Sequence, residues 1–294
     1  MAGAAGAAGY ARVDTGYIFK RRREVRLLRP RGGKGGKRTP RVASEKRHQA
    51  FAIEGRAVSL PPLDNAALSE ARTLYPSTVV QVEGLTNLLV SGVNSRNIGG
   101  QIMKGPAKGF PIFTLTLQER ATCPSSCRHW RSCYGNSMHM AKRVQHGPAF
   151  EARLEAELAV LQSRHPRGFA VRLHVLGDFY SLEYVQLWAG FLKKYRSLFV
   201  FGFTARWQRE DPIAVELVQL VMAEWGRFCI RFSNAPVDEC STVSIEHPRQ
   251  KPDDAIICPA QMQSKTKRGA TQAQSCGSCA LCWSTRRRIA FLQQ

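Results

Sequence analysis

The sequence predicts an α/β protein built on a parallel sheet, either open or forming part of a (β/α) barrel. Segments with apolar residues at helical spacing alternate along the chain with short, continuously apolar segments that are typical of buried strands. Such alternation favours right-handed crossovers between parallel strands. With 294 residues, 44% of them apolar, the chain is long enough to bury the core of such a domain.

Three amphipathic helices are expected in the middle of the chain. The first covers 148–162, with apolar residues on one face and glutamates on the others. Ser181 is a suitable N-cap for the second. Asp211 as N-cap and Pro212 at the first helical position begin the third. Strands are expected to follow or precede these helices at 169–179, 198–203, 227–235 and 254–261.

The remainder divides by composition. Residues 1–48 are expected to form a disordered basic arm, and 49–84 a poorly defined lead-in with a short helix over 64–74. Residues 85–294 are expected to form a single α/β metal-binding domain. Within it, short apolar runs between glycines over 85–117 predict a small antiparallel ribbon.

The basic arm concentrates positive charge. It holds 14 Lys and Arg against 3 acidic residues, which is about half of the formal charge of +21. Such an arm can bind nucleic acid through its phosphates, although a solvated extension is an equally good interpretation. No segment has the length of a membrane span or the order of a secretory signal, so we expect no membrane partner and a cytoplasmic protein with reduced cysteines. The oligomeric state is not predicted.

Seven of the nine cysteines lie in two groups, at spacings that favour an inorganic centre over independent core packing. Cys229 lies in an apolar strand and Cys240 in an expected loop, and both are left outside the groups. The first group comprises Cys123, Cys127 and Cys133, and the second comprises Cys258, Cys276, Cys279 and Cys282.

The first group supplies three thiolates. Three ligands leave one metal position open for substrate, water or a cofactor. The alternative is a closed zinc site of three cysteines and one histidine, completed by His129 or His139.

The second group supplies four thiolates, three of them within seven residues. This close spacing favours an iron-sulfur cluster of the 4Fe-4S type, and a four-cysteine zinc site is the alternative. Basic residues flank the group and are expected to compensate its negative charge or to form an exposed face: Lys265, Lys267, Arg268, Arg286, Arg287 and Arg288.

The working site of a parallel sheet lies beyond the carboxyl ends of its strands. Asp178 and Arg206 are the cofactor-binding candidates there: the first could bind a hydroxyl or take a proton, and the second could hold a carboxylate or phosphate. A loop-capping role for Asp178 and a surface salt bridge for Arg206 are the alternatives. The remaining residues at the expected strand ends are Gly177, Tyr180, Thr204, Ser233, Asn234 and Cys258.

Several segments between residues 85 and 292 together resemble the phage "gene product 88" family, which occurs in bacteriophages and bacterial genomes. This resemblance implies a phage or prophage protein and assigns no activity. It rests on LLVSGVNSRNIGG, TLTLQERATCPSSCRHWRSCYGN, RLHVLGDFYS, FGFTAR, RFSNA, STVSIE, ICPAQ, CGSCALCW and IAFL.

A looser similarity is to radical S-adenosylmethionine enzymes, which combine a three-cysteine cluster with a (β/α) barrel. It implies that Cys123, Cys127 and Cys133 hold a 4Fe-4S cluster whose fourth iron binds S-adenosylmethionine. The gap of five residues before Cys133 departs from the usual spacing of that family.

The leading interpretation is therefore a phage-type iron-sulfur protein, in which an open three-cysteine cluster acts on S-adenosylmethionine and a four-cysteine cluster lies near the C-terminus. The first alternative is a zinc-stabilised protein that binds nucleic acid through its basic arm. A second alternative is a phage structural protein with purely architectural metal.

Overall fold

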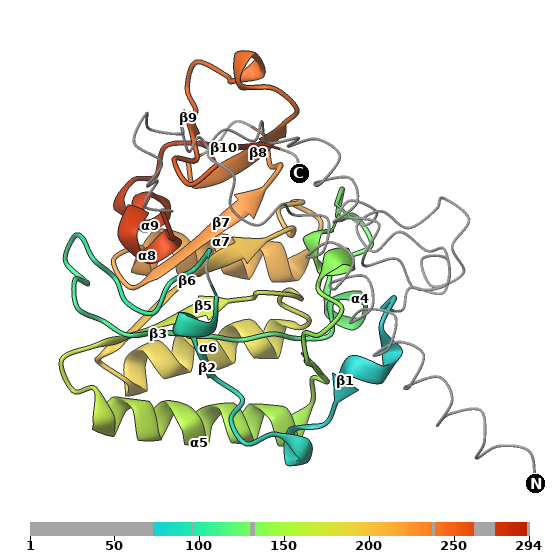
Figure 1. Cartoon of the computed structure of the whole chain (residues 1–294), viewed down its shortest axis with the longest axis vertical. Coiled ribbons are helices and arrows are strands. Elements are labelled where there is room, and N and C mark those ends of the chain that lie inside the picture. The colour runs from blue at the N-terminus through green and yellow to red at the C-terminus, as the bar shows by residue number, and fades with distance from the viewer. Residues whose placement is uncertain (1–72, 96, 130–132, 237–238, 262–273, 293–294) are drawn as a thin grey trace, which may run out of the picture. The chain divides into compact units, whose positions relative to one another are not determined.

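The protein is described by a computed structural model that covers residues 73–95, 97–129, 133–236, 239–261 and 274–292 (Figure 1). These residues belong to two compact units. The smaller contributes residues 133–139, with one short 3-10 helix, η4 (Tyr134–Ser137), and the larger contributes all the rest. The expected basic arm over 1–48 and most of the expected helix over 64–74 lie outside the described residues.

The larger unit is built on a mixed eight-stranded sheet whose order nearly follows the chain: β2-β3-β5-β6-β7-β8-β10-β9. All neighbouring strands are parallel except β2 and β3. This confirms an α/β protein with a mostly parallel sheet. The strands are β2 (Val90–Ser91), β3 (Ile112–Thr114), β5 (Phe169–Leu173), β6 (Leu198–Thr204), β7 (Phe228–Ser233), β8 (Ser241–Ile245), β9 (Ile256–Ile257) and β10 (Ile289–Leu292).

The three expected helices are present as α5 (Pro148–Arg164), α6 (Leu182–Lys194) and α7 (Pro212–Glu224). Their caps are also as predicted. The Ser181 hydroxyl accepts a hydrogen bond from the backbone N–H of Tyr184 at 3.1 Å, and the Asp211 carboxylate accepts one from that of Ile213 at 2.9 Å.

The two faces of the sheet have different partners because side chains alternate along each strand. On β5, Phe169, Val171 and Leu173 pack into the core that α5, α6 and α7 cover, and Figure 1 shows these helices together along one side of the sheet. On the opposite face, Ala170 packs with residues of β6 and β7 against Trp283. That face is covered by the short helices α8 (Cys276–Cys279) and α9 (Leu281–Ser284).

Some sequence expectations differ from the observed fold. β2 and β3 are antiparallel, but both belong to the main sheet, so the structure does not confirm a separate glycine-rich ribbon. β8 and β10 were not predicted as strands. Cys229 is a core residue, as expected, and Cys240 lies, also as expected, outside the strands, fully buried in the turn before β8.

The remaining elements are short. A separate pair of parallel strands joins β1 (Val79–Val80) to β4 (Arg143–Val144). Within the described part of the chain, no helix combines the length and the apolar character needed to cross a membrane. The other short helices are η1 (Pro76–Thr78), η2 (Val82–Gly84), η3 (Gly92–Asn94), α4 (Glu119–Thr122) and η5 (Pro248–Gln250).

Candidate metal centre

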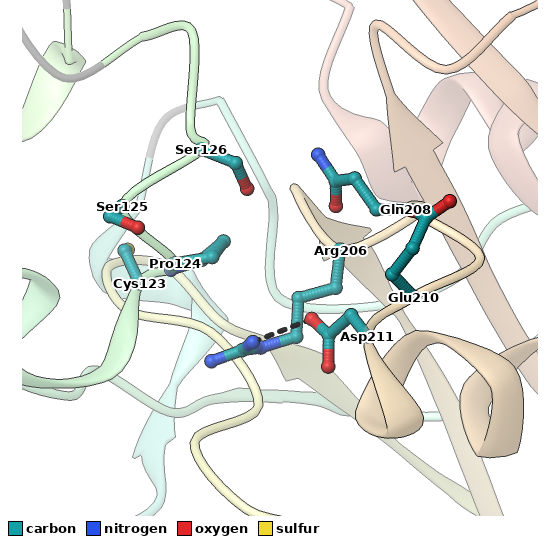
Figure 2. A pocket seen from close by; sticks show the side chains of 8 residues that line it. All are labelled: Cys123, Pro124, Ser125, Ser126, Arg206, Gln208, Glu210 and Asp211. Carbon is teal, nitrogen blue, oxygen red and sulfur yellow. Dashed lines mark hydrogen bonds and ion pairs between the residues drawn. The ribbon is translucent and has the colours of Figure 1, made fainter.

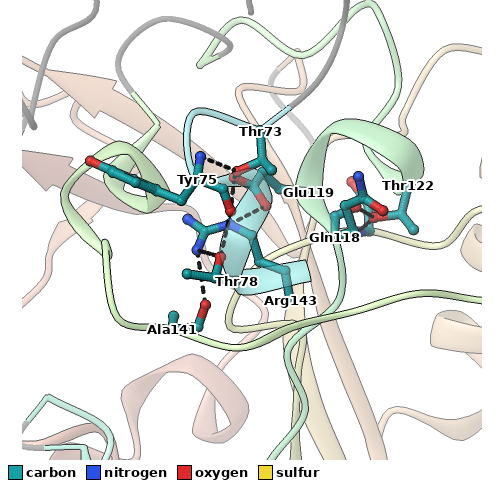
Figure 3. Close-up of polar contacts among 9 residues, drawn as sticks. Thr73, Tyr75, Thr78, Gln118, Glu119, Thr122, Ala141 and Arg143 are labelled. Atoms are coloured by element: carbon teal, nitrogen blue, oxygen red, sulfur yellow. Dashed lines mark hydrogen bonds and ion pairs between the residues drawn. The ribbon is translucent and has the colours of Figure 1, made fainter. Parts of the chain in front are cut away.

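A buried ion pair joins Glu119 and Arg143, which lie before and after the chain segment that contains the first cysteine group. The Arg143 Nε atom lies 3.0 and 2.9 Å from the two carboxylate oxygens of Glu119, and the two side chains are 0% and 3% exposed. Thr73 donates to the same carboxylate at 3.0 Å, and Arg143 also donates to Thr78 at 2.9 Å (Figure 3). Glu119 begins α4, which ends immediately before Cys123, and Arg143 lies in β4, after the cysteine segment. The ion pair therefore joins the residues on either side of that segment.

The three cysteines of the first group are all half-buried. Cys123 is the residue that follows α4, and the backbone N–H of Cys127 donates to Pro124 at 3.0 Å. These two belong to the larger unit. Cys133 belongs to the smaller unit, where it precedes η4 as its N-cap. A common centre for the three sulfurs stays a prediction.

His129, one alternative ligand of this group, is engaged with the carboxyl ends of β7 and β8. Its Nε2 atom lies 2.6 Å from the Asn234 amide nitrogen and 3.1 Å from the Ser244 hydroxyl. Burial lowers the pKa of His129, which favours the neutral ring that accepts these hydrogen bonds. A ring that accepts at Nε2 carries its proton on Nδ1, so zinc binding through Nδ1 would require the other tautomer, in which Nε2 donates instead.

Asp178, in the loop between β5 and α6, fixes the loops at the carboxyl edge of the sheet. Its carboxylate accepts hydrogen bonds from the Thr204 hydroxyl at 2.6 Å and from the backbone N–H groups of Ala205 at 2.7 Å and Phe179 at 2.8 Å. The side chain is only 2% exposed. Burial raises its pKa to about 6, although these donors and the charge on Arg206 act in the opposite direction. In this geometry Asp178 supports the loop after β6, and direct contact with a cofactor stays a prediction.

The first cysteine segment is joined to this edge. The Thr122 hydroxyl, one residue before Cys123, accepts a hydrogen bond from the backbone N–H of Asp178 at 3.1 Å. Gly177 allows this approach: it has a φ of +91°, and a Cβ atom there would lie 2.7 Å from the Thr122 hydroxyl. Hydrogen bonds therefore connect the start of the cysteine segment with the loop that carries Arg206.

An open cleft of about 600 Å³ lies between the two loops. Figure 2 shows residues of the cysteine segment on one side and residues after β6 on the other. Arg206 forms an ion pair with Asp211 at 2.7 Å and also donates to the backbone carbonyl of Phe179. The cleft thus brings both signs of charge next to Cys123. Its lining comprises Cys123, Pro124, Ser125, Ser126, Arg206, Gln208, Glu210 and Asp211.

The second cysteine group is held by backbone contacts with the loop before β3. The N–H of Cys276 donates to Asn97 at 2.8 Å, and that of Gly277 donates to Ile98 at 2.9 Å. A Cβ atom at Gly277 would lie only 2.2 Å from the backbone oxygen of Gln101, so glycine is required for this approach. Cys258 follows β9 and is fixed by a 2.9 Å backbone hydrogen bond to Ala290 of β10.

Three thiols of the second group, those of Cys258, Cys276 and Cys282, have raised pKa values. Burial raises the pKa of Cys258 to about 11, and the neighbouring Cys276 and Cys279 add to this shift. Burial likewise raises the pKa of Cys282, with further contributions from the other three. That the four sulfurs share one centre stays a prediction. Over the described ranges, no three His, Cys, Asp or Glu side chains are already arranged to hold a metal ion.

Two buried arginines of the sheet lie beside these thiols. Burial raises the pKa of Cys276 while the charge on Arg172 lowers it, and Arg231 has the same opposing effect on Cys282. Sequence analysis did not single out either arginine as a site residue. The available signal was a lone cation within an apolar strand, in FAVRL and in FCIRF. In contrast, the flanking Arg286 and Arg288 form ion pairs with Glu239 and Asp254 at 3.4 and 3.9 Å, and Lys265, Lys267 and Arg268 lie outside the described residues.

Comparison with known protein families, with curated proteins and with solved structures finds no match to this chain. Membership of the gene product 88 family therefore stays a prediction.

The Glu119–Arg143 pair gives a first prediction. Replacement of Glu119 by Gln leaves Arg143 buried without its countercharge, and should lower the free energy of unfolding by about 3 to 5 kcal/mol. Glu155→Gln is the control, because its ion pair with Lys194 is exposed and should contribute less than about 1 kcal/mol. Urea denaturation of both variants measures the difference, and equal losses would contradict a structural role for the buried pair.

Asp178 gives a second prediction, on pH. Because its pKa is raised from 3.8 to about 6, the native state holds this proton more tightly than the unfolded chain. Its contribution to stability is present below about pH 4 and is lost as pH rises through 6, a loss of about 3 kcal/mol. Asp178→Asn should remove this decline. Melting temperatures of both proteins between pH 4 and pH 7 test it, and identical pH profiles would contradict the raised pKa.

Gly277 gives a third prediction. Alanine at this position should push α8 away from Gln101 and lower stability by about 1 to 3 kcal/mol, with loss of any metal bound by the second cysteine group. Gly226→Ala is a matched control, since no atom lies within 4 Å of the added Cβ. Thermal unfolding and metal analysis of the two variants compare them directly, and a Gly277→Ala protein that behaves like the control would show that the close contact is unimportant.

Proposed function

We propose that this chain is an iron-sulfur protein in which Cys258, Cys276, Cys279 and Cys282 hold a 4Fe-4S cluster. The observation that carries this proposal is the packing of Cys276 and Cys282 on one face of the sheet, where the buried Arg231 donates to the Cys282 carbonyl at 2.7 Å. Four thiolates give such a centre a net negative charge, and nearby guanidinium groups compensate it. A cluster of this kind supplies reversible one-electron transfer.

The donor set fits a cluster better than the zinc alternative. Three of the cysteines recur at intervals of three residues across α8 and α9, whereas structural zinc sites commonly combine two separated pairs. Among the described residues, these side chains are not yet arranged around a metal ion. The proposal therefore includes a change of cysteine rotamers that brings the sulfurs around the cluster.

For the first group we propose an open three-cysteine cluster of the radical S-adenosylmethionine type. The support is the cleft beside Cys123, in which Arg206 and the acidic Asp211 offer partners for the carboxylate and the ammonium of an amino acid. The near-sequential strand order, with α5, α6 and α7 on one face, supports a partial (β/α) barrel around such a site. Asp178 would position the loop that carries Arg206.

Metal analysis gives a fourth prediction. Protein purified without oxygen should contain iron and acid-labile sulfide in equal amounts. Replacing Cys276, Cys279 and Cys282 together by Ala should remove about half of the iron, because the first group keeps its own cluster. Cys229→Ala is the control: this thiol is buried and donates to Trp225 at 2.8 Å, so its loss should leave the iron content unchanged.

Zinc without sulfide would contradict the proposal. Combined with nucleic-acid binding that weakens steeply as salt is added, this result would establish the zinc-stabilised nucleic-acid-binding protein instead.

A further inference from the structure

We propose that Arg172 and Arg231 are the counter-cations of the four-cysteine centre and that they raise its reduction potential. This inference rests on the proposed function, because it requires that the centre be a redox-active cluster. It extends that function by assigning a tuning role to two residues of the sheet that are not ligands.

Arg231 contacts the cysteine segment directly. It lies on β7, is 0% exposed, and its Nε atom donates to the backbone carbonyl of Cys282 at 2.7 Å. Its other nitrogens donate to the backbone carbonyls of Thr285, and of Arg287 at 3.0 Å. The guanidinium is therefore fixed beneath the end of α9, in a position set by three carbonyls of the segment that supplies the ligands.

Arg172 approaches the same segment from β5, two strands away in the sheet. It is 7% exposed and donates to the backbone carbonyls of Leu173 and His174. Its guanidinium carbon lies 4.7 Å from the ring centroid of Phe203 and 6.0 Å from that of Phe201. Phe201 in turn packs against Trp283, the residue after Cys282, with ring centroids 4.5 Å apart.

Neither guanidinium forms an ion pair with a carboxylate among the residues that the structure describes. A buried cation without a countercharge is costly, and a thiolate-bound cluster is a countercharge at the right place. Reduction adds one electron to this centre. Nearby fixed cations stabilise the more negative, reduced form, so they raise the potential.

The test is a redox titration of the intact protein with dithionite, followed by electron paramagnetic resonance. Arg172→Met and Arg231→Met should each favour the oxidised cluster by roughly tenfold, which is a fall of about 59 mV for a one-electron couple. Arg172→Lys and Arg231→Lys retain the charge and should stay within a few-fold of wild type. Arg153→Met is the control, because Arg153 lies on α5 and pairs with Glu157 at 2.7 Å on the other face of the sheet.

The outcomes separate this inference from the proposed function. Unchanged potentials in Met variants that keep their iron and sulfide overturn the inference alone. Equal falls in the Lys and Met variants also overturn it, because guanidinium shape rather than charge would then matter. A wild-type protein that binds zinc or no metal overturns both. If Arg231→Met does not fold, the comparison of Arg172→Met with Arg172→Lys decides the question.

Discussion

Two positive charges buried on one face of the sheet constrain the rest of this protein. Arg172 and Arg231 extend from β5 and β7 away from the helical layer, into a space that the C-terminal cysteine segment fills. Carbonyl groups satisfy their hydrogen bonds but do not neutralise their charge. The proposed thiolate centre would supply that neutralisation, which links the packing of the sheet to the proposed chemistry.

The two faces of the sheet therefore have separate roles. One face is apolar and packs against α5, α6 and α7, which gives the unit its core. The opposite face accommodates the four-cysteine segment, and the carboxyl edge holds the loop that leads to the first group. At that edge Asp178 joins Thr122 to Thr204, so the cysteine segment and the loop after β6 are parts of one hydrogen-bonded network. Because the Asp178 carboxylate is buried and accepts three hydrogen bonds, it is better placed to hold the loop after β6 than to contact a ligand.

Much of the fold could be predicted from the sequence because its signals are local. The caps at Ser181 and Asp211 and the apolar stripes of α5 to α7 need no tertiary context. β8 and β10 were missed because short or polar strands are defined by their neighbours in the sheet rather than by their own pattern. The cysteine groups were visible from spacing. Arg172 and Arg231 were not identified because period-two alternation shows which face a residue occupies but not which distant segment covers it.

The second cysteine group is proposed to enclose an iron-sulfur cluster. X-ray absorption at the iron edge tests it most directly, in protein whose first group has been removed by replacing Cys123, Cys127 and Cys133 with Ala. A bound cluster should give iron surrounded by sulfur, with further iron atoms as the next neighbours. Iron bound by oxygen or nitrogen, or a zinc signal with sulfur ligands and no neighbouring metal, would contradict it.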